Sequence, residues 1–212
     1  MAAARAPQIR ARKDPQQDRS SQLVEAVLEA AVQVLMSEGA QRFTTARVAE
    51  RAGVSVGSLY QYFPNKAAIL FRLQADEWQR TTALLSGILA QRDVSPMLRL
   101  RRLVHAFVRS ECEEAAIRIA LADAAPLYRD APEAAAAKAE AGKVYRRFVA
   151  EVLPDVPDDA RHRAGDLIKM TLGQVGASFS ATPRNADEIA AWSDAMADMF
   201  VAYLEALRAE TR

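Results

Sequence analysis

The stretch from residue 44 to residue 66 constrains the fold of this chain most, because it combines two helix starts with a glycine between them. Thr44 or Thr45 can begin the first helix, since a side-chain hydroxyl accepts a hydrogen bond from a backbone N–H that has no helical partner. Gly53 stands where a helix end needs left-handed backbone, and Ser55 can begin a second helix. The pattern predicts two short helices joined by a tight turn.

The second of these helices, expected over residues 56–62, has an apolar face and a polar face. Leu59 and Phe63 lie four residues apart and anchor the helix to the protein. The opposite face carries small hydroxyl, phenol and amide groups: Ser58, Tyr60, Gln61 and Tyr62. Such a helix suits contact with base edges and phosphates in the major groove of DNA. An ordinary helical hairpin with a polar surface is the alternative, because this arrangement is common in all-α proteins.

Composition and periodicity predict an all-α fold. Half of the 212 residues are hydrophobic, Gly and Pro are few, and no sustained alternating run indicates a strand. No apolar run approaches the roughly 20 residues needed to cross a bilayer, and the N-terminus lacks the apolar core of a secretory signal. We therefore expect a cytoplasmic protein. The single cysteine, Cys112, fits a reducing compartment. It is interpreted as a core-filling residue, with a reactive thiol as the alternative.

The charge is unevenly distributed. Residues 1–66 hold nine Lys and Arg against six Asp and Glu, whereas the remainder holds nineteen against twenty-one. The basic excess thus falls on the predicted DNA-binding part. Residues 1–20 show no buried-face periodicity, so we expect a disordered basic arm. It either follows phosphates or the minor groove, with Arg19 nearest the first helix, or is a solvated tail. Its basic residues are Arg5, Arg10, Arg12, Lys13 and Arg19.

Apolar periodicity predicts further helices on both sides of this stretch. The first, over residues 21–38, ends at Gly39 and completes a three-helix DNA-binding domain over 21–66. Asn65 can cap a helix that begins near Lys66. The remaining expected helices form a second domain over residues 67–212, at 66–91, 96–112, 113–125, 132–153, 158–180 and 187–207.

The last two expected helices are apolar over more than a narrow stripe. That is more than packing against one body needs, so it predicts a four-helix interface between two copies of the chain. A helix pair inside one subunit's core is the alternative. The candidate interface residues are Leu172, Val175, Phe179, Trp192, Met196, Met199 and Tyr203.

Catalytic and metal-binding patterns are absent from the sequence. The only histidines are His105 and His162, and no metal-ligand spacing occurs. There is no phosphate-binding glycine loop, nucleophile elbow or His-Glu-x-x-His motif. Asp123, Asp130 and Glu133 are better interpreted as caps and solvated charges than as an acid–base pair. We expect neither an enzyme nor a cofactor or metal.

The run Ala-Gly-Val-Ser-Val-Gly-Ser-Leu-Tyr-Gln-Tyr-Phe-Pro-Asn-Lys, residues 52–66, closely resembles the signature of the TetR family of bacterial transcription regulators. So does Val-Leu-Glu-Ala-Ala-Val-Gln-Val-Leu-Met-Ser-Glu-Gly, residues 27–39, followed by Phe43-Thr44-Thr45. The resemblance implies an N-terminal helix-turn-helix domain and a larger C-terminal ligand-binding and dimerisation domain. It also implies that the last two helices form the dimer.

The resemblance also assigns DNA contacts. It implies that Thr45 touches backbone or base, that Ser58 and Gln61 contact bases or phosphates, and that hydroxyls at Tyr60 and Tyr62 bind phosphate. Ala46 and Val56 depart from the pattern, because some family members read bases with polar side chains there. The candidate DNA-binding residues are Thr45, Arg47, Ser55, Ser58, Tyr60, Gln61, Tyr62 and Lys66, with Arg47 as possible compensation for Ala46.

Ligand-controlled DNA binding, usually repression, is the activity that the resemblance implies. We expect a homodimeric repressor that binds a palindromic operator, with recognition helices roughly 34–36 Å apart. A small molecule releases it by binding the DNA-incompetent state more tightly. The candidate pocket residues are Trp78, His105, Phe107, Cys112 and Tyr128, each with a plain core or surface role as the alternative. A helical small-molecule-binding protein without specific DNA binding is the competing function.

Overall fold

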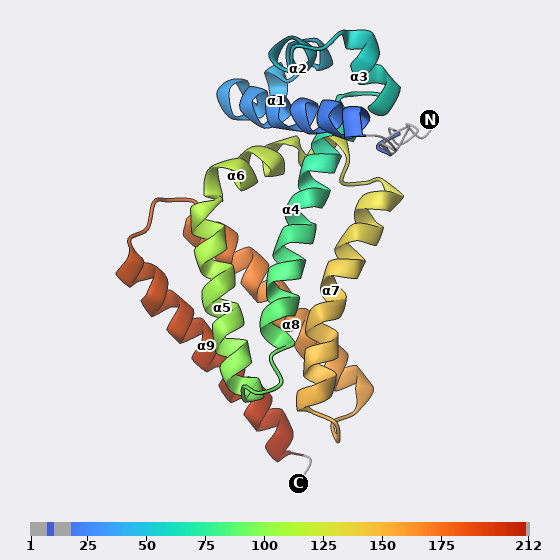
Figure 1. Ribbon diagram of the computed structural model, residues 1–212. Coiled ribbons are helices and arrows are strands. Elements are labelled where there is room, and N and C mark those ends of the chain that lie inside the picture. Colours follow the sequence, from blue (N-terminus) through green and yellow to red (C-terminus); the bar gives the residue numbers. More distant parts are fainter. Residues whose placement is uncertain (1–7, 11–17, 211–212) are drawn as a thin grey trace, which may run out of the picture. The chain divides into compact units, whose positions relative to one another are not determined.

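The computed structural model describes residues 8–10 and 18–210, and within these ranges its regular structure is helical (Figure 1). The all-α prediction is confirmed. The elements are α1 (Asp18–Arg42), α2 (Thr45–Arg51), α3 (Val56–Tyr62), α4 (Lys66–Leu89), α5 (Pro96–Glu113), α6 (Ala115–Ala124), the 3₁₀ helix η1 (Ala125–Leu127), α7 (Pro132–Val152), α8 (Asp158–Ser180) and α9 (Ala186–Ala209). In the described ranges, no helix is both long and apolar enough to span a membrane.

Side-chain caps set the helix starts around the predicted turn. The Thr44 hydroxyl accepts a hydrogen bond from the Arg47 backbone N–H at 3.3 Å, so Thr44 rather than Thr45 begins α2. Ser55 Oγ accepts from the Ser58 N–H at 3.0 Å. Asn65 Oδ1 accepts from the Ala68 N–H at 2.9 Å at the start of α4. Each cap satisfies a donor that the helix itself leaves unpaired.

Two glycines supply left-handed backbone near the same turn. Gly53 has φ of 67° after α2, and Gly39 has φ of 74° within α1. Gly39 breaks the regular helix there, and a short helical continuation reaches Arg42. The predicted break at Gly39 is therefore confirmed, since only glycine adopts this conformation without a steric penalty from Cβ.

The chain forms two compact units that differ from the predicted division at residue 66. The first holds the described residues up to 78 together with 116–138, and the second holds 79–115 and 139–210. The start of α4 belongs to the first unit because its apolar side chains are buried with those of α1 to α3. Ile69 and Leu70 are fully buried in that core. The predicted boundary at residue 66, where α4 begins, did not take this packing into account.

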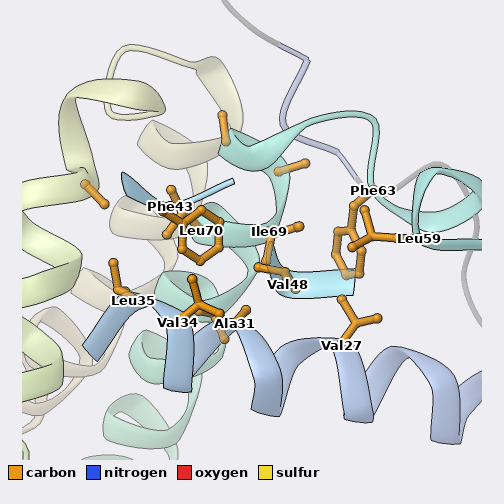
Figure 2. Close-up of a cluster of buried hydrophobic side chains, with 14 of the residues drawn as sticks. Val27, Ala31, Val34, Leu35, Phe43, Val48, Leu59, Phe63, Ile69 and Leu70 are labelled. Carbon is orange, nitrogen blue, oxygen red and sulfur yellow. The ribbon is translucent and has the colours of Figure 1, made fainter. Parts of the chain in front are cut away.

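The core of the first unit holds α2 and α3 against α1 (Figure 2). Leu59 and Phe63 are 0% and 1% exposed, so their predicted role as the anchor of α3 is confirmed. The side chains that meet them or continue the cluster are Val27, Ala31, Val34, Leu35, Phe43, Val48, Ile69 and Leu70.

Residues 8–10 correct the prediction of a disordered arm over residues 1–20. Ile9 is 2% exposed and packs in the core of the first unit. The Asn65 side-chain amide donates to the Gln8 carbonyl at 2.9 Å. An isolated isoleucine shows no periodicity, so the sequence pattern missed this contact. Arg5, Arg12, Lys13 and the Arg19 side chain lie outside the described residues.

Arg99 is the largest of the fully buried side chains that the structure describes in the second unit. It lies on α5, is 2% exposed, and its guanidinium donates to the Glu151 carboxylate of α7 and to the Leu89 carbonyl. The guanidinium also lies 5.7 Å from the centre of the Phe148 ring. Hydrogen bonding from Arg99 lowers the pKa of Glu151 below its ordinary value, with a smaller contribution from Arg92. A buried cation therefore ties three elements of this unit together.

Candidate nucleic-acid interface

Helix α3 presents a polar surface from a rigid base. Tyr60 and Gln61 are exposed, Ser58 is half-buried, and the buried Leu59 between them fixes the orientation of the helix. Val56, at the start of α3, is also exposed. The predicted polar face is thus present at three of its four positions.

A hydroxyl contact joins the two helices of the turn. Thr45 Oγ1, at the start of α2, lies 3.1 Å from the Tyr60 phenol oxygen on α3. Ser55 and Ser58 make a similar hydroxyl contact at 2.8 Å. These groups can each donate or accept, so they suit both phosphate oxygens and base edges. Two predicted DNA-binding residues far apart in sequence are therefore brought together.

Tyr62 is a correction to the predicted polar face. Its side chain is 8% exposed and belongs to the core cluster of the first unit. The reason is helical geometry, because Tyr62 follows Leu59 by three residues and shares its inward side. The expectation of an exposed Tyr62 was wrong. Lys66 occupies the first position of α4, as predicted, and is half-buried.

Arg47 is oriented toward the end of α1. Its guanidinium donates to the Glu38 carboxylate and to the Arg42 carbonyl, the latter at 2.8 Å. Glu38 also lies 3.5 Å from the Arg42 guanidinium. The sequence pattern did not single out Glu38 as a partner of Arg47. The Glu38–Arg42 spacing of four residues was a local signal for an ion pair, but nothing local linked Glu38 to Arg47.

The five candidate pocket residues are divided between the two units. Trp78 and Tyr128 belong to the first, and His105, Phe107 and Cys112 to the second. A hollow of about 480 Å³ in the first unit contains none of them. It is lined by Glu38, Gly39, Ala40, Gln41, Arg42 and Asp123.

Tyr128 and Phe107 are core residues. Tyr128 is 2% exposed, and its hydroxyl donates to the Leu121 carbonyl at 3.1 Å or to Gln74 Oε1 at 3.2 Å. Burial, and to a smaller extent Glu77, raises the pKa of Tyr128. Phe107 is 7% exposed in the second core. Both residues therefore fit the alternative given for the candidate pocket residues, which is a plain role in the core.

The other three candidates are partly accessible. Trp78 lies beneath the Lys138 ammonium, 5.6 Å from ring centre to nitrogen. His105 Nε2 lies 2.9 Å from Asp194 Oδ1, which links α5 to α9. Burial raises the pKa of the Cys112 thiol, and Glu111 adds to the effect. A raised pKa reduces thiolate reactivity at neutral pH.

The predicted dimer residues fall into two groups. Leu172, Phe179 and Met196 are 0%, 4% and 6% exposed within their own chain, so they have no free surface to offer a partner and are corrected to core residues. Val175 and Tyr203 are half-buried. Trp192 and Met199 are each 50% exposed. Periodicity in the sequence predicted that both α8 and α9 are apolar. It did not predict which side of each helix packs into the core of its own chain.

The described residues define a helix-turn-helix protein with an all-helical body, a class of DNA-binding regulators. Residues 27–73 match the family model described as bacterial regulatory proteins, tetR family. Residues 95–207 match the model described as tetracyclin repressor-like, C-terminal domain. The chain belongs to the TetR family of bacterial transcriptional regulators, which confirms the resemblance seen in the sequence.

Curated relatives match over partial lengths. The nucleoid occlusion factor SlmA of Vibrio campbellii is 52% identical over 44 residues, 20% of this chain and 22% of that protein. SlmA of Haemophilus ducreyi is 31% identical over 103 residues, 48% of each chain. The match thus spans at most about half the length of these two relatives.

Solved structures share the fold over nearly the whole chain. A transcriptional regulator from Pseudomonas aeruginosa has a TM-score of 0.66 at 19% identity, covering 95% of this chain and 97% of that one. FadR from Bacillus subtilis, solved with stearoyl-CoA, has a TM-score of 0.60 at 17% identity, covering 84% and 97%. These likenesses confirm the two-part helical fold.

Proposed function

We propose that this protein is a homodimeric repressor that binds a palindromic DNA operator and is released from it by a small molecule in the cytoplasm. The observation that carries the proposal is the exposed face of α3, fixed by the buried Leu59 and joined to α2 through the Thr45–Tyr60 hydroxyl contact. A short, rigid helix with hydroxyl, amide and phenol groups matches the chemistry of the major groove.

Roles within the interface follow from the position of each group. Gln61 is exposed on α3 and offers an amide that can bond an adenine edge at two points. Tyr60 and Thr45 offer hydroxyls at the junction of the two helices, where phosphate contact is the simpler role. Lys66 stands at the start of α4, where an ammonium and free backbone N–H groups together favour a phosphate.

Tyr60→Phe and Lys66→Ala are expected to weaken binding to every duplex, because each removes a phosphate contact. For Lys66→Ala, the slope of log affinity against log salt should flatten by about 0.9, the value for one neutralised phosphate. Gln61→Ala should instead change sequence preference by about 1–3 kcal/mol at one base pair. Titrations by fluorescence anisotropy at several salt concentrations measure these effects. Equal changes from all three variants would contradict the assignments.

Selection from a random pool of duplexes by the full chain tests the function itself. Sequencing should show enrichment of a palindrome whose half-sites are centred about one helical turn apart. The competing function, a helical small-molecule-binding protein without specific DNA binding, is supported by the apolar Ala46 and Val56 at positions open to DNA. It predicts no enriched motif, and that outcome would refute the repressor.

The exposed apolar side chains of α8 and α9 form the dimer surface in this proposal. Trp192 and Met199 lie seven residues apart on α9, and Leu167 and Met170 are 47% and 65% exposed on α8. Two copies of such helices bury this surface in a four-helix interface. The corrected core residues Leu172, Phe179 and Met196 support it from beneath.

Trp192→Glu combined with Met199→Glu is expected to convert the dimer to a monomer, because each carboxylate loses its solvation in the interface. Sedimentation velocity measures the change in mass. Met36→Glu is the matched control, since Met36 is 45% exposed on α1 in the other unit. A dimer that persists in the double variant would place the interface elsewhere.

The effector acts by differential binding. A small molecule releases the repressor only if it binds the DNA-incompetent state more tightly than the competent one. Within the second unit, His105 and Cys112 are both partly accessible positions of α5, seven residues apart. These two residues are the proposed effector-facing positions. Trp78 has the same proposed role in the first unit.

A further inference from the structure

Three charged side chains meet where α1 ends and α2 begins. Glu38 contributes the only carboxylate among them, and it pairs with the guanidiniums of both Arg42 and Arg47. Of the two arginines, Arg47 is held by one additional hydrogen bond, which it donates to the Arg42 carbonyl at 2.8 Å. The Glu38 side chain is 22% exposed, whereas those of Arg47 and Arg42 are 40% and 68% exposed. One shared carboxylate thus leaves this cluster with a net charge of +1.

The cluster borders the proposed DNA surface. Arg47 follows Thr45 by two residues in the first turn of α2, and Thr45 touches Tyr60 of the recognition helix. A guanidinium at such a position is a strong ligand for phosphate, because its fork of donors binds two oxygens at once. In the structure, Nη1 of Arg47 faces the end of α1 and donates to two oxygen atoms of the protein itself, one in the Glu38 carboxylate and one in the Arg42 carbonyl.

We propose that Glu38 is a positioning residue that withholds Arg47 from the phosphates of DNA and so limits affinity that does not depend on sequence. The inference rests on the proposed DNA-binding function. Phosphate contacts strengthen binding to every duplex and carry no sequence information. Each one strengthens the salt dependence of binding by about 0.9 in the slope. A carboxylate that occupies the guanidinium removes one such contact from the interface.

Glu38→Gln in the full chain tests this directly, because the amide keeps the size of the side chain and loses its charge. The probe is a 30-base-pair duplex of scrambled sequence, titrated by fluorescence anisotropy between 50 and 200 mM salt. The slope is expected to steepen by about 0.9, so the affinity of the variant falls about 3.5-fold more than that of the wild type over this range. Glu38→Asp keeps the charge and should retain the slope of the wild type.

Two further variants separate release of Arg47 from a general change in charge. The double variant Glu38→Gln with Arg47→Ala restores the cluster's net charge of +1 and should return the slope to that of the wild type. Glu50→Gln removes an exposed carboxylate from α2 without touching the Glu38–Arg47 pair, and it should change the slope less than Glu38→Gln does. An equal change in Glu50→Gln, or a steep slope that persists in the double variant, would overturn the proposal.

A purely structural role for Glu38 gives a different result. Glu38→Gln would then lower the melting temperature and leave the salt slope unchanged, which would refute the inference while the DNA-binding function stands. Absence of any enriched motif when the wild type selects from the random pool of duplexes would instead refute the proposed function, and this inference with it.

Discussion

Replacing Arg99 by alanine is expected to lower the free energy of unfolding of the full chain by about 3–5 kcal/mol. The side chain is 2% exposed, so its removal leaves a cavity between α5 and α7. It also deprives the Leu89 carbonyl and the Glu151 carboxylate of a charged donor. The free energy is measured by urea denaturation followed by circular dichroism.

Arg92→Ala is the matched control, because Arg92 pairs with the same carboxylate but is 71% exposed. An exposed ion pair contributes about 0–1 kcal/mol, so this variant should remain close to the wild type. Arg99→Met keeps most of the buried volume, so its free energy of unfolding should lie between those of Arg92→Ala and Arg99→Ala. Equal losses for Arg92→Ala and Arg99→Ala would contradict the role assigned to burial.

The pH dependence of the Arg99 effect follows from the lowered pKa of Glu151. A carboxylate whose pKa is lower in the folded state than in the unfolded state stabilises the fold above its unfolded pKa. That contribution is lost as the pH falls through the lower, folded value. The stability difference between wild type and Arg99→Met should therefore narrow below the ordinary value of 4.5. A stability difference that stays constant down to pH 3 would show that the charge pairing of Glu151 with Arg99 adds nothing to the stability of the fold.

Leu59→Ala is expected to cost about 2–5 kcal/mol of stability in the first unit, the usual range for truncating a buried leucine. Leu59 is 0% exposed and, with Tyr62, is one of the two buried residues of a helix of only seven residues. So short a helix has little stability of its own and depends on packing. Affinity for DNA should fall at least about 10-fold, equivalent to 1.4 kcal/mol of lost ordering of α3.

Val56→Ala provides the comparison on the same helix. Val56 is 40% exposed, so its truncation should change the free energy of unfolding by less than about 0.5 kcal/mol. Thermal denaturation and duplex titration of both variants test the prediction. Undiminished DNA affinity in Leu59→Ala would show that α3 does not need its anchor in order to bind.

The local features of the fold were predictable because they depend on neighbours in sequence. Ser55 and Asn65 begin helices through backbone groups three residues away, and Gly53 relieves a constraint at its own position. Leu59 and Phe63 revealed the anchored side of α3 by their spacing. The polar face of α3 indicated DNA binding, the family resemblance favoured it over an ordinary helical hairpin, and the structure added the Thr45–Tyr60 contact.

The features that were missed depend on segments far apart in sequence. Tyr62 and Leu172 have side chains that suit either an interior or an interface, and only the packing of other helices decides between them. The Glu38–Arg47 pair spans nine residues across a helix end, where no periodicity applies. Ile9 is buried by helices that begin after it, so its own surroundings in sequence contained no signal.

Asn65 joins two distant segments through opposite ends of one side chain. Its carbonyl oxygen accepts from Ala68, and its amide nitrogen donates to Gln8, 57 residues earlier. Aspartate at this position would still begin α4 but would set a negative oxygen against the Gln8 carbonyl. The chemistry of one amide thereby makes the placement of the earliest described residues conditional on the turn that precedes α4.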